Sequence, residues 1–316
     1  MGGRLAVVAI GGNSLIKDRM HQSVRDQYIA AHETSGHVAA MVEAGWNVVV
    51  GHGNGPQVGF ILRRSEIAAH ELHEIPLDVC GADSQGAIGY ALAQNLQNVL
   101  RRRGIGRPVA AVVTQVEVAR DDPAFVSPSK PIGSFMDETE ARRREKRDGW
   151  DVVEDASRGW RRVVASPRPR RIVEIEAIRA LVEAGEIVVA VGGGGIPVVA
   201  DATGDLTGVE AVIDKDLGCS LLARDLSAEL LLISTAVEKV ALNFGTPAQR
   251  WVDHLTLAEA RRYLAEGVHF AAGSMAPKIE AIIEYLEDGG TRAIVTDPPN
   301  LGAALAGRTG TLFTVD

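Results

Sequence analysis

Three lysines in this sequence have positions that suit the binding of phosphate groups. Lys215 lies between Asp214 and Asp216, after an apolar run and at the expected start of a helix. Lys278 lies in the first turn expected for a later helix, and Lys130 lies in a long polar stretch that could bring it over the same site. Helix N-termini attract anions, and a lysine ammonium there strengthens the attraction. Any single lysine could equally be a solvated surface charge, and the aspartates could simply cap their helix, which is the better interpretation of Asp214.

Three glycine-rich segments each follow a short apolar run and are candidates to receive an anion. They are Gly11-Gly12-Asn13-Ser14 after residues 5–10, Gly53-Asn54-Gly55-Pro56-Gln57 after 48–50, and Gly192-Gly193-Gly194-Gly195 after 187–191. Glycine lets a ligand approach the backbone N–H groups, and ligands bind at the carboxyl ends of parallel strands. One such segment alone could be only a tight turn, but three at one sheet edge predict a bound polyanion. With the three lysines and a flanking aspartate, they favour phosphoryl transfer.

Other functions are less compatible with the sequence. It contains neither the Gly-x4-Gly-Lys-Ser/Thr motif nor a dinucleotide-binding fingerprint. The 316 residues are 46% hydrophobic and 23% charged, and the net charge of −8 argues against a general nucleic-acid binder. No stretch resembles a signal peptide or a membrane span, so we expect a cytoplasmic protein with no membrane partner. Cys80 and Cys219 lack metal-type spacing and are expected to be reduced, buried thiols.

Apolar runs and helical patterns alternate along most of the chain, which predicts an α/β fold with a mainly parallel sheet. Strands are expected at 5–10, 47–50, 108–113, 187–191, 209–213, 230–233, 293–296 and 311–315. Helices are expected at 23–44, 57–69, 138–146, 170–183, 214–222, 257–264 and 277–286, with another running from an N-cap at Asp83 to Gly104.

The alternation breaks between about residues 117 and 169, where the sequence is polar and rich in arginine and proline. Loops of this length seldom lack structure in a compact domain unless they act as lids or binding elements. We therefore expect one domain, residues 1–316, with a small protruding subdomain inserted at about 117–169. Simple surface decoration is the alternative.

Several motifs together resemble carbamate kinases of the amino-acid kinase family, in the same order from the first strand to the last. They are Gly11-Gly12-Asn13, Gly53-Asn54-Gly55-Pro56-Gln57-Val58-Gly59, Pro76-Leu77-Asp78-Val79-Cys80-Gly81, Lys130-Pro131-Ile132-Gly133, Gly159-Trp160-Arg161-Arg162-Val163-Val164, Gly192-Gly193-Gly194-Gly195-Ile196-Pro197, Asp214-Lys215-Asp216 and Gly273-Ser274-Met275. The resemblance implies a three-layer αβα sandwich, a homodimer and a role in arginine catabolism. It also implies reversible phosphoryl transfer between ATP and carbamate, with Mg²⁺ between the nucleotide phosphates.

The resemblance also assigns roles to individual residues. Lys215 and Lys278 would hold the nucleotide phosphates, Asp216 would orient these lysines, and Lys130 would reach the transferred group. The carbamoyl phosphate end would be cradled by backbone N–H groups of Gly11, Gly12, Asn13, Gly53, Asn54 and Gly55. Further nucleotide contacts would come from Gly193, Gly194 and Met275.

Departures from the family pattern leave all the proposed catalytic groups in place. They are Ser14, Ala82-Asp83, Ala276 and Asp297-Pro298-Pro299. Two alternatives stay open: a kinase of another small carboxylate, and a non-catalytic nucleotide-binding regulator. Acetylglutamate and aspartate kinases usually carry a lysine in the first strand, and its absence from Val8-Ala9-Ile10 favours carbamate. A regulator would be expected to have lost a lysine or Asp216.

Overall fold

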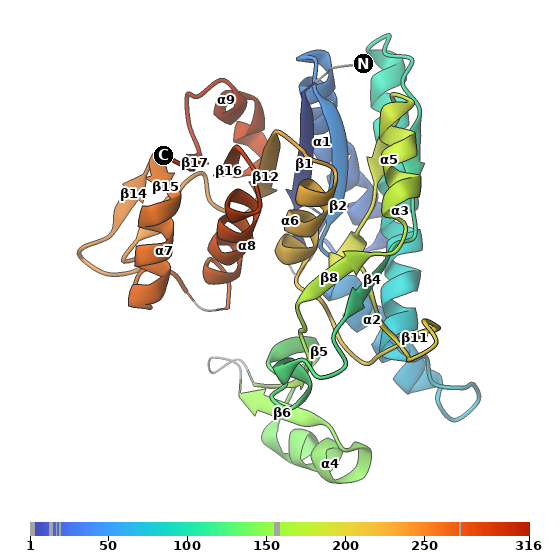
Figure 1. Cartoon of the computed structure of the whole chain (residues 1–316). Coiled ribbons are helices and arrows are strands. Elements are labelled where there is room, and N and C mark those ends of the chain that lie inside the picture. The colour runs from blue at the N-terminus through green and yellow to red at the C-terminus, as the bar shows by residue number, and fades with distance from the viewer. Residues whose placement is uncertain (1–3, 13–14, 17, 19, 155–158, 272) are drawn as a thin grey trace.

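An eight-stranded sheet forms the centre of the molecule, and helices cover both of its faces (Figure 1). The computed structural model describes residues 4–12, 15–16, 18, 20–154, 159–271 and 273–316. In spatial order the strands are β15 (His254–Thr256), β17 (Thr311–Thr314), β16 (Arg292–Thr296), β12 (Leu230–Ser234), β1 (Leu5–Ile10), β2 (Asn47–His52), β9 (Ile187–Val189) and β3 (Val109–Ala111). Within this sheet, neighbouring strands are parallel except β16 and β17. The prediction of an α/β fold with a mainly parallel sheet is confirmed.

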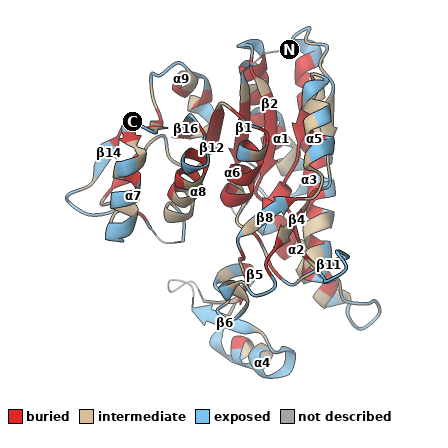
Figure 2. Cartoon of the chain, viewed as in Figure 1, coloured by how far each residue is buried: buried red, intermediate tan, exposed pale blue. Residues whose placement is uncertain are grey.

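The central strands are buried on both faces, because successive side chains point into two different cores. Val7 and Ala9 of β1 belong to one hydrophobic cluster, and Ala6, Val8 and Ile10 belong to the other. The first cluster includes residues of α5 (Ile175–Glu183), α6 (Lys215–Asp225), α7 (Leu257–Glu266) and α8 (Ala276–Glu287). The second includes residues of α1 (Val24–Glu43), α3 (Leu77–Arg102) and α9 (Leu301–Leu305). Figure 2 shows this pattern as buried strands between half-exposed helices, so the layers form an αβα sandwich.

The ends of several helices follow from local sequence. Ser23 and Asp26 form a capping box at the start of α1, and Gly45 adopts a φ of +86° beyond its end. Thr256 and Glu259 form a second capping box at the start of α7, and Pro277 lies in the first turn of α8. These boundaries match the predictions from the sequence.

A second, four-stranded sheet was not predicted as such. Its strands, in spatial order, are β11 (Leu206–Gly208), β10 (Ile196–Ala200), β4 (Gln115–Val118) and β8 (Pro169–Ile172). β4 and β8 are antiparallel neighbours, and the chain between them forms the insertion. Other short elements in the described part of the chain are the hairpin of β13 (Val240–Leu242) and β14 (Arg250–Val252) and the 3₁₀ turns η2 (Pro123–Phe125), η3 (Gly192–Gly194) and η4 (Pro298–Asn300).

The insertion carries its own sheet and helix and projects from one end of the main body (Figure 1). It contains β5 (Lys130–Met136), α4 (Glu138–Asp148), β6 (Asp151–Glu154) and β7 (Trp160–Val164). At its base, Ile132 and Val164 join Val58 of α2 (Gly55–Ala68) and Leu77 in a small hydrophobic cluster. We interpret these elements as the protruding subdomain expected at about 117–169.

Three expectations about local structure were wrong. Asp83 caps no helix, because α3 already begins at Leu77, where Pro76 sets the N-terminus and the Leu77 side chain is buried. Asp83 is instead an exposed residue within α3. The helix expected at 170–183 begins only at Ile175, because residues 169–172 pair with β4. Residues 209–213 form no strand, although Ala211 makes an isolated bridge to Ala165.

Candidate active site

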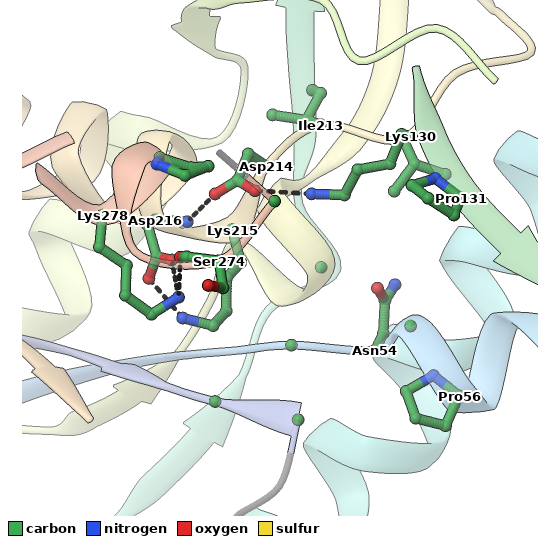
Figure 3. A pocket seen from close by; sticks show the side chains of 18 of the residues that line it. Asn54, Pro56, Lys130, Pro131, Ile213, Asp214, Lys215, Asp216, Ser274 and Lys278 are labelled. Carbon is green, nitrogen blue, oxygen red and sulfur yellow. Dashed lines mark hydrogen bonds and ion pairs between the residues drawn. The ribbon is translucent and has the colours of Figure 1, made fainter. Parts of the chain in front are cut away.

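A cavity of about 430 Å³ lies where the carboxyl ends of β1 and β2 meet the N-termini of α2, α6 and α8 and the start of β5 (Figure 3). Its lining residues are Gly11, Gly12, Gly53, Asn54, Gly55, Pro56, Lys130, Pro131, Ile132, Gly193, Val212, Ile213, Asp214, Lys215, Asp216, Thr235, Ala236, Gly273, Ser274, Pro277 and Lys278. The three lysines singled out in the sequence therefore face the same space, although Lys130 and Lys278 are far apart along the chain. Asn13 and Ser14 lie outside the described residues.

Two of the lysines share one buried carboxylate. Asp216, only 2% exposed, accepts a hydrogen bond from the ammonium of Lys215 and another, of 3.1 Å, from Nζ of Lys278. Burial alone would lower the pKa of Lys215, but the charge of Asp216 and its hydrogen bond raise that pKa above its ordinary value. Figure 3 shows both side chains directed at Asp216. Two ammonium groups on one carboxylate leave a net positive charge at the cavity wall, which suits a phosphate group.

The third lysine pairs with the helix cap. Lys130 Nζ lies 2.6 Å from Oδ2 of Asp214, whose other oxygen accepts a 2.9 Å hydrogen bond from the backbone N–H of Asp216. Asp214 is thus the N-cap of α6, as preferred from the sequence, and it is also an ion-pair partner. Lys130 begins β5 of the subdomain, so the pair links the subdomain to α6.

The first two glycine-rich segments touch each other at the floor of the cavity. A Cβ atom on Gly53 would lie 3.1 Å from the backbone nitrogen of Gly12 and 3.3 Å from Cδ of Lys215. The N–H of Gly11 donates to the carbonyl of Ser234 and that of Gly53 donates to the carbonyl of Ile10. Both N–H groups donate to carbonyls of the protein here, although both residues line the cavity, and their expected contacts with the ligand stay predictions.

Two other glycines suit the cradle better. Gly12 lines the cavity, and Gly55 is the first residue of α2. The N–H groups of the first helical turn have no acceptor within their own helix. Asn54, the N-cap of α2, also lines the cavity, but its amide nitrogen donates to Ser84 over 2.8 Å, so its carboxamide is already oriented by α3.

The third glycine-rich segment is a packed turn in which each glycine faces a different part of the protein. Added Cβ atoms would lie 2.4 Å from the His52 ring at Gly192, 2.1 Å from the Asn54 amide at Gly193, 2.8 Å from the Ile213 carbonyl at Gly194 and 2.1 Å from the Val116 side chain at Gly195. Only Gly193 of the four lines the cavity, and Met275 does not line it either. Nucleotide contacts from Gly194 and Met275 stay predictions.

Several residues around the cavity were missed from the sequence. Thr235 and Ala236 follow β12, and the strand predicted at 230–233 was a usable signal, because parallel strands end at a common edge. Thr114, which binds the third glycine segment, follows the strand predicted at 108–113 and carried the same signal, but Gln85, which binds that segment too, did not. Gln85 and Gly192 are separated by 107 residues.

The two cysteines are free and buried. Burial raises the pKa of Cys80 to about 11 and that of Cys219 to about 12, so both stay as thiols at neutral pH. Within the described residues, no group of three or more His, Cys, Asp or Glu side chains could hold a metal ion. None of the described helices combines the length and the apolar character needed to cross a membrane.

The αβα fold, the cluster of lysines and the glycine-lined cavity together indicate a protein that transfers phosphoryl groups. The sequence model of the amino acid kinase family matches residues 4–297. The chain belongs to the amino acid kinase family.

Known proteins similar to this chain share nearly its full length. A carbamate kinase-like protein of Escherichia coli K12, YahI, is 50% identical over 311 residues, covering 97% of this chain and 98% of the relative. The carbamate kinase of Pyrococcus horikoshii is 47% identical over 312 residues, with 98% of both chains covered. A structure of Giardia lamblia carbamate kinase bound to AMP-PNP superposes with a TM-score of 0.93 at 38% identity, covering 100% of this chain and 99% of that one.

Proposed function

We propose that this protein is a carbamate kinase, which transfers a phosphoryl group reversibly between ATP and carbamate. The observation that carries the proposal is the arrangement of Lys215 and Lys278 on the buried carboxylate of Asp216, facing the glycine-lined strand ends. Relatives named carbamate kinase, aligned over nearly the whole of both chains, support the choice of acceptor. The AMP-PNP in the Giardia structure supports ATP and ADP as the nucleotides.

The proposed reaction can be followed in the direction that makes ATP. A terminal β-phosphate oxygen of ADP attacks the phosphorus of carbamoyl phosphate, and the bond from phosphorus to the carbamate oxygen breaks. Carbamate leaves with the electron pair. Charge develops on the oxygens around phosphorus, and preorganised cations and N–H donors stabilise it.

Residues of this chain supply that stabilisation in the proposal. Lys215 and Lys278 bind the nucleotide phosphates, and Asp216 holds both ammonium groups in place. The ammonium group of Lys130 leaves its ion pair with Asp214 and binds the transferred phosphoryl group. Gly12, Asn54 and Gly55 hold the carbamoyl end. Pro131 and Ile132 cover the cavity from the subdomain side and reduce the access of water.

Mg²⁺ would be bound at this site by the substrate and not directly by the protein. Asp214 and Asp216 are the carboxylates that line the cavity in the described chain, and both are already paired with lysines. We therefore propose that Mg²⁺ enters with the nucleotide, held by phosphate oxygens and water. When bound, it would neutralise phosphate charge.

The deciding measurement is a coupled assay of ATP formation from ADP, carbamoyl phosphate and Mg²⁺. We expect turnover by the wild-type chain and loss of it in Lys215→Ala. Absence of turnover by folded protein would overturn the proposal. ATP consumption with acetylglutamate or aspartate instead would identify a kinase of another carboxylate, and nucleotide binding without any turnover would identify a regulator.

We also propose that the protein forms a homodimer. β3 is an edge strand of the large sheet. Ala111 of β3 lines a small cavity together with Tyr90 and Val113, whose large hydrophobic side chains are exposed. A second copy would cover these groups. Analytical ultracentrifugation of the wild type and Tyr90→Asp tests this, with a monomeric wild type contradicting it. The cytoplasmic location and the role in arginine catabolism stay predictions of the sequence.

A further inference from the structure

A buried carboxamide that lies outside the active-site cavity binds the third glycine segment. We infer that Gln85 is a positioning residue for phosphoryl transfer. Together with Thr114 it holds the turn of residues 191–195 in one conformation. That conformation sets the distance between Asn54 and the N-terminus of α6, where Lys215 lies. This inference rests on the proposed function. Gln85 lies on α3, is 5% exposed and is not among the residues that line the active-site cavity.

The hydrogen bonds of Gln85 join three segments that are distant in sequence. Its Nε2 donates to the carbonyls of Thr114, at 3.1 Å, and Gly192, at 2.9 Å. Its Oε1 accepts from the N–H of Thr114 at 2.7 Å. The hydroxyl of Thr114 accepts from the N–H of Val191 at 3.0 Å and donates to the carbonyl of Val112 at 2.8 Å. The start of the turn is therefore bound on both Val191 and Gly192.

The turn requires such support because its backbone is left-handed. The φ angle is +53° at Val191, +68° at Gly193, +95° at Gly194 and +100° at Gly195. A β-branched residue rarely adopts a positive φ, and such a conformation persists only where the surroundings enforce it. Within the turn, only the weak geometry of a 3₁₀ turn helps, through the bonds from Gly194 to Val191 and from Gly195 to Gly192. Beyond the packing of its glycines, the turn receives hydrogen bonds from outside through the carboxamide of Gln85 and the hydroxyl of Thr114.

The position of the turn determines the spacing across the cavity. Gly193 packs on the carboxamide of Asn54, and Gly194 packs on the carbonyls of Ile213 and Asp214, directly before Lys215. Gly194 also packs against α6: a Cβ atom added to Gly218 would lie only 2.7 Å from the carbonyl oxygen of Gly194, so no side chain fits there. A turn displaced from this position would move Asn54 relative to Lys215 and Asp216.

Ser84, the residue before Gln85 on α3, accepts the hydrogen bond from the Asn54 amide. One turn of α3 thus orients both Asn54 and the segment against which Asn54 packs. A misplacement of about 1 Å between reacting groups lowers rates by about 10²-fold. We therefore expect disruption of Gln85 to affect kcat more than the KM for ADP.

The test uses two substitutions that preserve side-chain size. Gln85→Glu can still accept from Thr114 but places a carboxylate against two carbonyl oxygens, and Thr114→Val removes the acceptor for Val191. We expect each to lower kcat at least about 10-fold in the ATP-forming assay, with the KM for ADP changed less than about 3-fold. Thr114→Ser restores the hydroxyl and should restore most of kcat.

Gln97→Glu is the matched control. Gln97 lies on the same helix and makes the same kind of backbone bridge, donating to the carbonyl of Arg107 at 3.2 Å and accepting from the N–H of Val109 at 3.0 Å. It lies far from the turn, so Gln97→Glu should lower the melting temperature without lowering kcat. If Gln85→Glu also lowered only the melting temperature, the role of Gln85 would be structural and the inference would be overturned.

A second readout does not depend on the reaction. Crystal structures of Gln85→Glu and Thr114→Val should show Val191 away from its positive φ and Asn54 displaced from Gly193. An unchanged turn in both variants would overturn the inference even where kcat falls. If the wild type makes no ATP from carbamoyl phosphate, the proposed function fails, and the crystal structures still decide whether Gln85 and Thr114 hold the turn.

Discussion

The ammonium nitrogen of Lys130 lies 2.6 Å from Oδ2 of Asp214. The first residue belongs to the inserted sheet and the second caps α6, so the pair joins the insertion to the main body across the cavity. Burial would raise the pKa of Asp214, but the charge of Lys130 and its hydrogen bond hold that pKa at about 2. The carboxyl group of Asp214 therefore stays ionised throughout the physiological pH range. A bound phosphate would compete with Asp214 for this ammonium.

Lys130→Met tests whether this ammonium serves the reaction. The substitution keeps the apolar stem and removes the charge that would meet the transferred group. We expect kcat to fall about 10²-fold or more, because the transferred group loses a preorganised positive charge. The melting temperature should fall much less, because Asp214 keeps its hydrogen bond from the N–H of Asp216 and can take up a proton. Lys146→Met, an exposed lysine of α4 in the same insertion, is the control and should leave kcat unchanged. A loss of melting temperature as severe as the loss of turnover would point to a structural role.

Lys215→Ala and Lys278→Ala should each lower kcat about 10²-fold or more, since each removes one preorganised positive charge from the phosphate site. Lys239→Ala is the comparison, because Lys239 pairs with Asp253 outside the cavity. Steady-state kinetics in the ATP-forming direction provide the measurement. Rates near that of the wild type would remove the altered lysine from the site.

Gly193→Ala should destabilise the protein by about 2–4 kcal/mol, because a positive φ is combined with a Cβ position 2.1 Å from the Asn54 amide. Gly204→Ala separates the two causes: Gly204 has a φ of +92° but no atom within 4 Å of its Cβ position. It should cost about 1 kcal/mol, from backbone strain alone. Urea unfolding gives both values. Equal losses would mean that the contact with Asn54 contributes nothing.

His52 predicts a dependence of stability on pH. Its side chain is buried against Gly192, and burial lowers its pKa from 6.5 to about 4. Between these values the unfolded chain binds a proton that the folded chain does not, so stability decreases as the pH falls from 6.5 to 4. The expected loss is about 3 kcal/mol. His52→Asn should show a shallower decrease in urea unfolding over this range. Identical slopes would contradict the assignment to His52.

The sequence was most informative where function depends on local pattern. Lys215, Asp216 and Lys278 could be placed at helix N-termini from capping residues and proline. The glycines after two apolar runs marked the strand end at residue 10 and placed the next one at residue 50, two residues before β2 ends. Asp83 led to a wrong helix start, because this residue, although of a good capping type, lies inside α3. Pro76 and the buried Leu77 set the start of that helix. Capping preference is local and weak, and the packing of the first turn decided the boundary.

Residues that act at long range could not be recognised. The four consecutive glycines suggested a ligand-binding loop, but the reason for most of them is contact with His52, Ile213 and Val116, which only the fold brings near. Gln85 gave no signal either, because a glutamine on the buried face of a helix has no characteristic spacing. The strand β10 was missed because it directly follows the four glycines, and β11 was missed because it has only three residues, Leu206–Gly208, after an irregular segment.

The insertion leaves the main body through β4 and returns through β8, and these two strands are paired neighbours with Val116 opposite Ile172. Removing the chain between them would leave two adjacent ends that a short turn could close. The insertion therefore adds no new crossover to the topology of the α/β layers. It is a module that recombination can lengthen, exchange or delete, and a change there would alter the cover over the phosphate site while the sheet, and α6 that begins with Lys215, keep their fold.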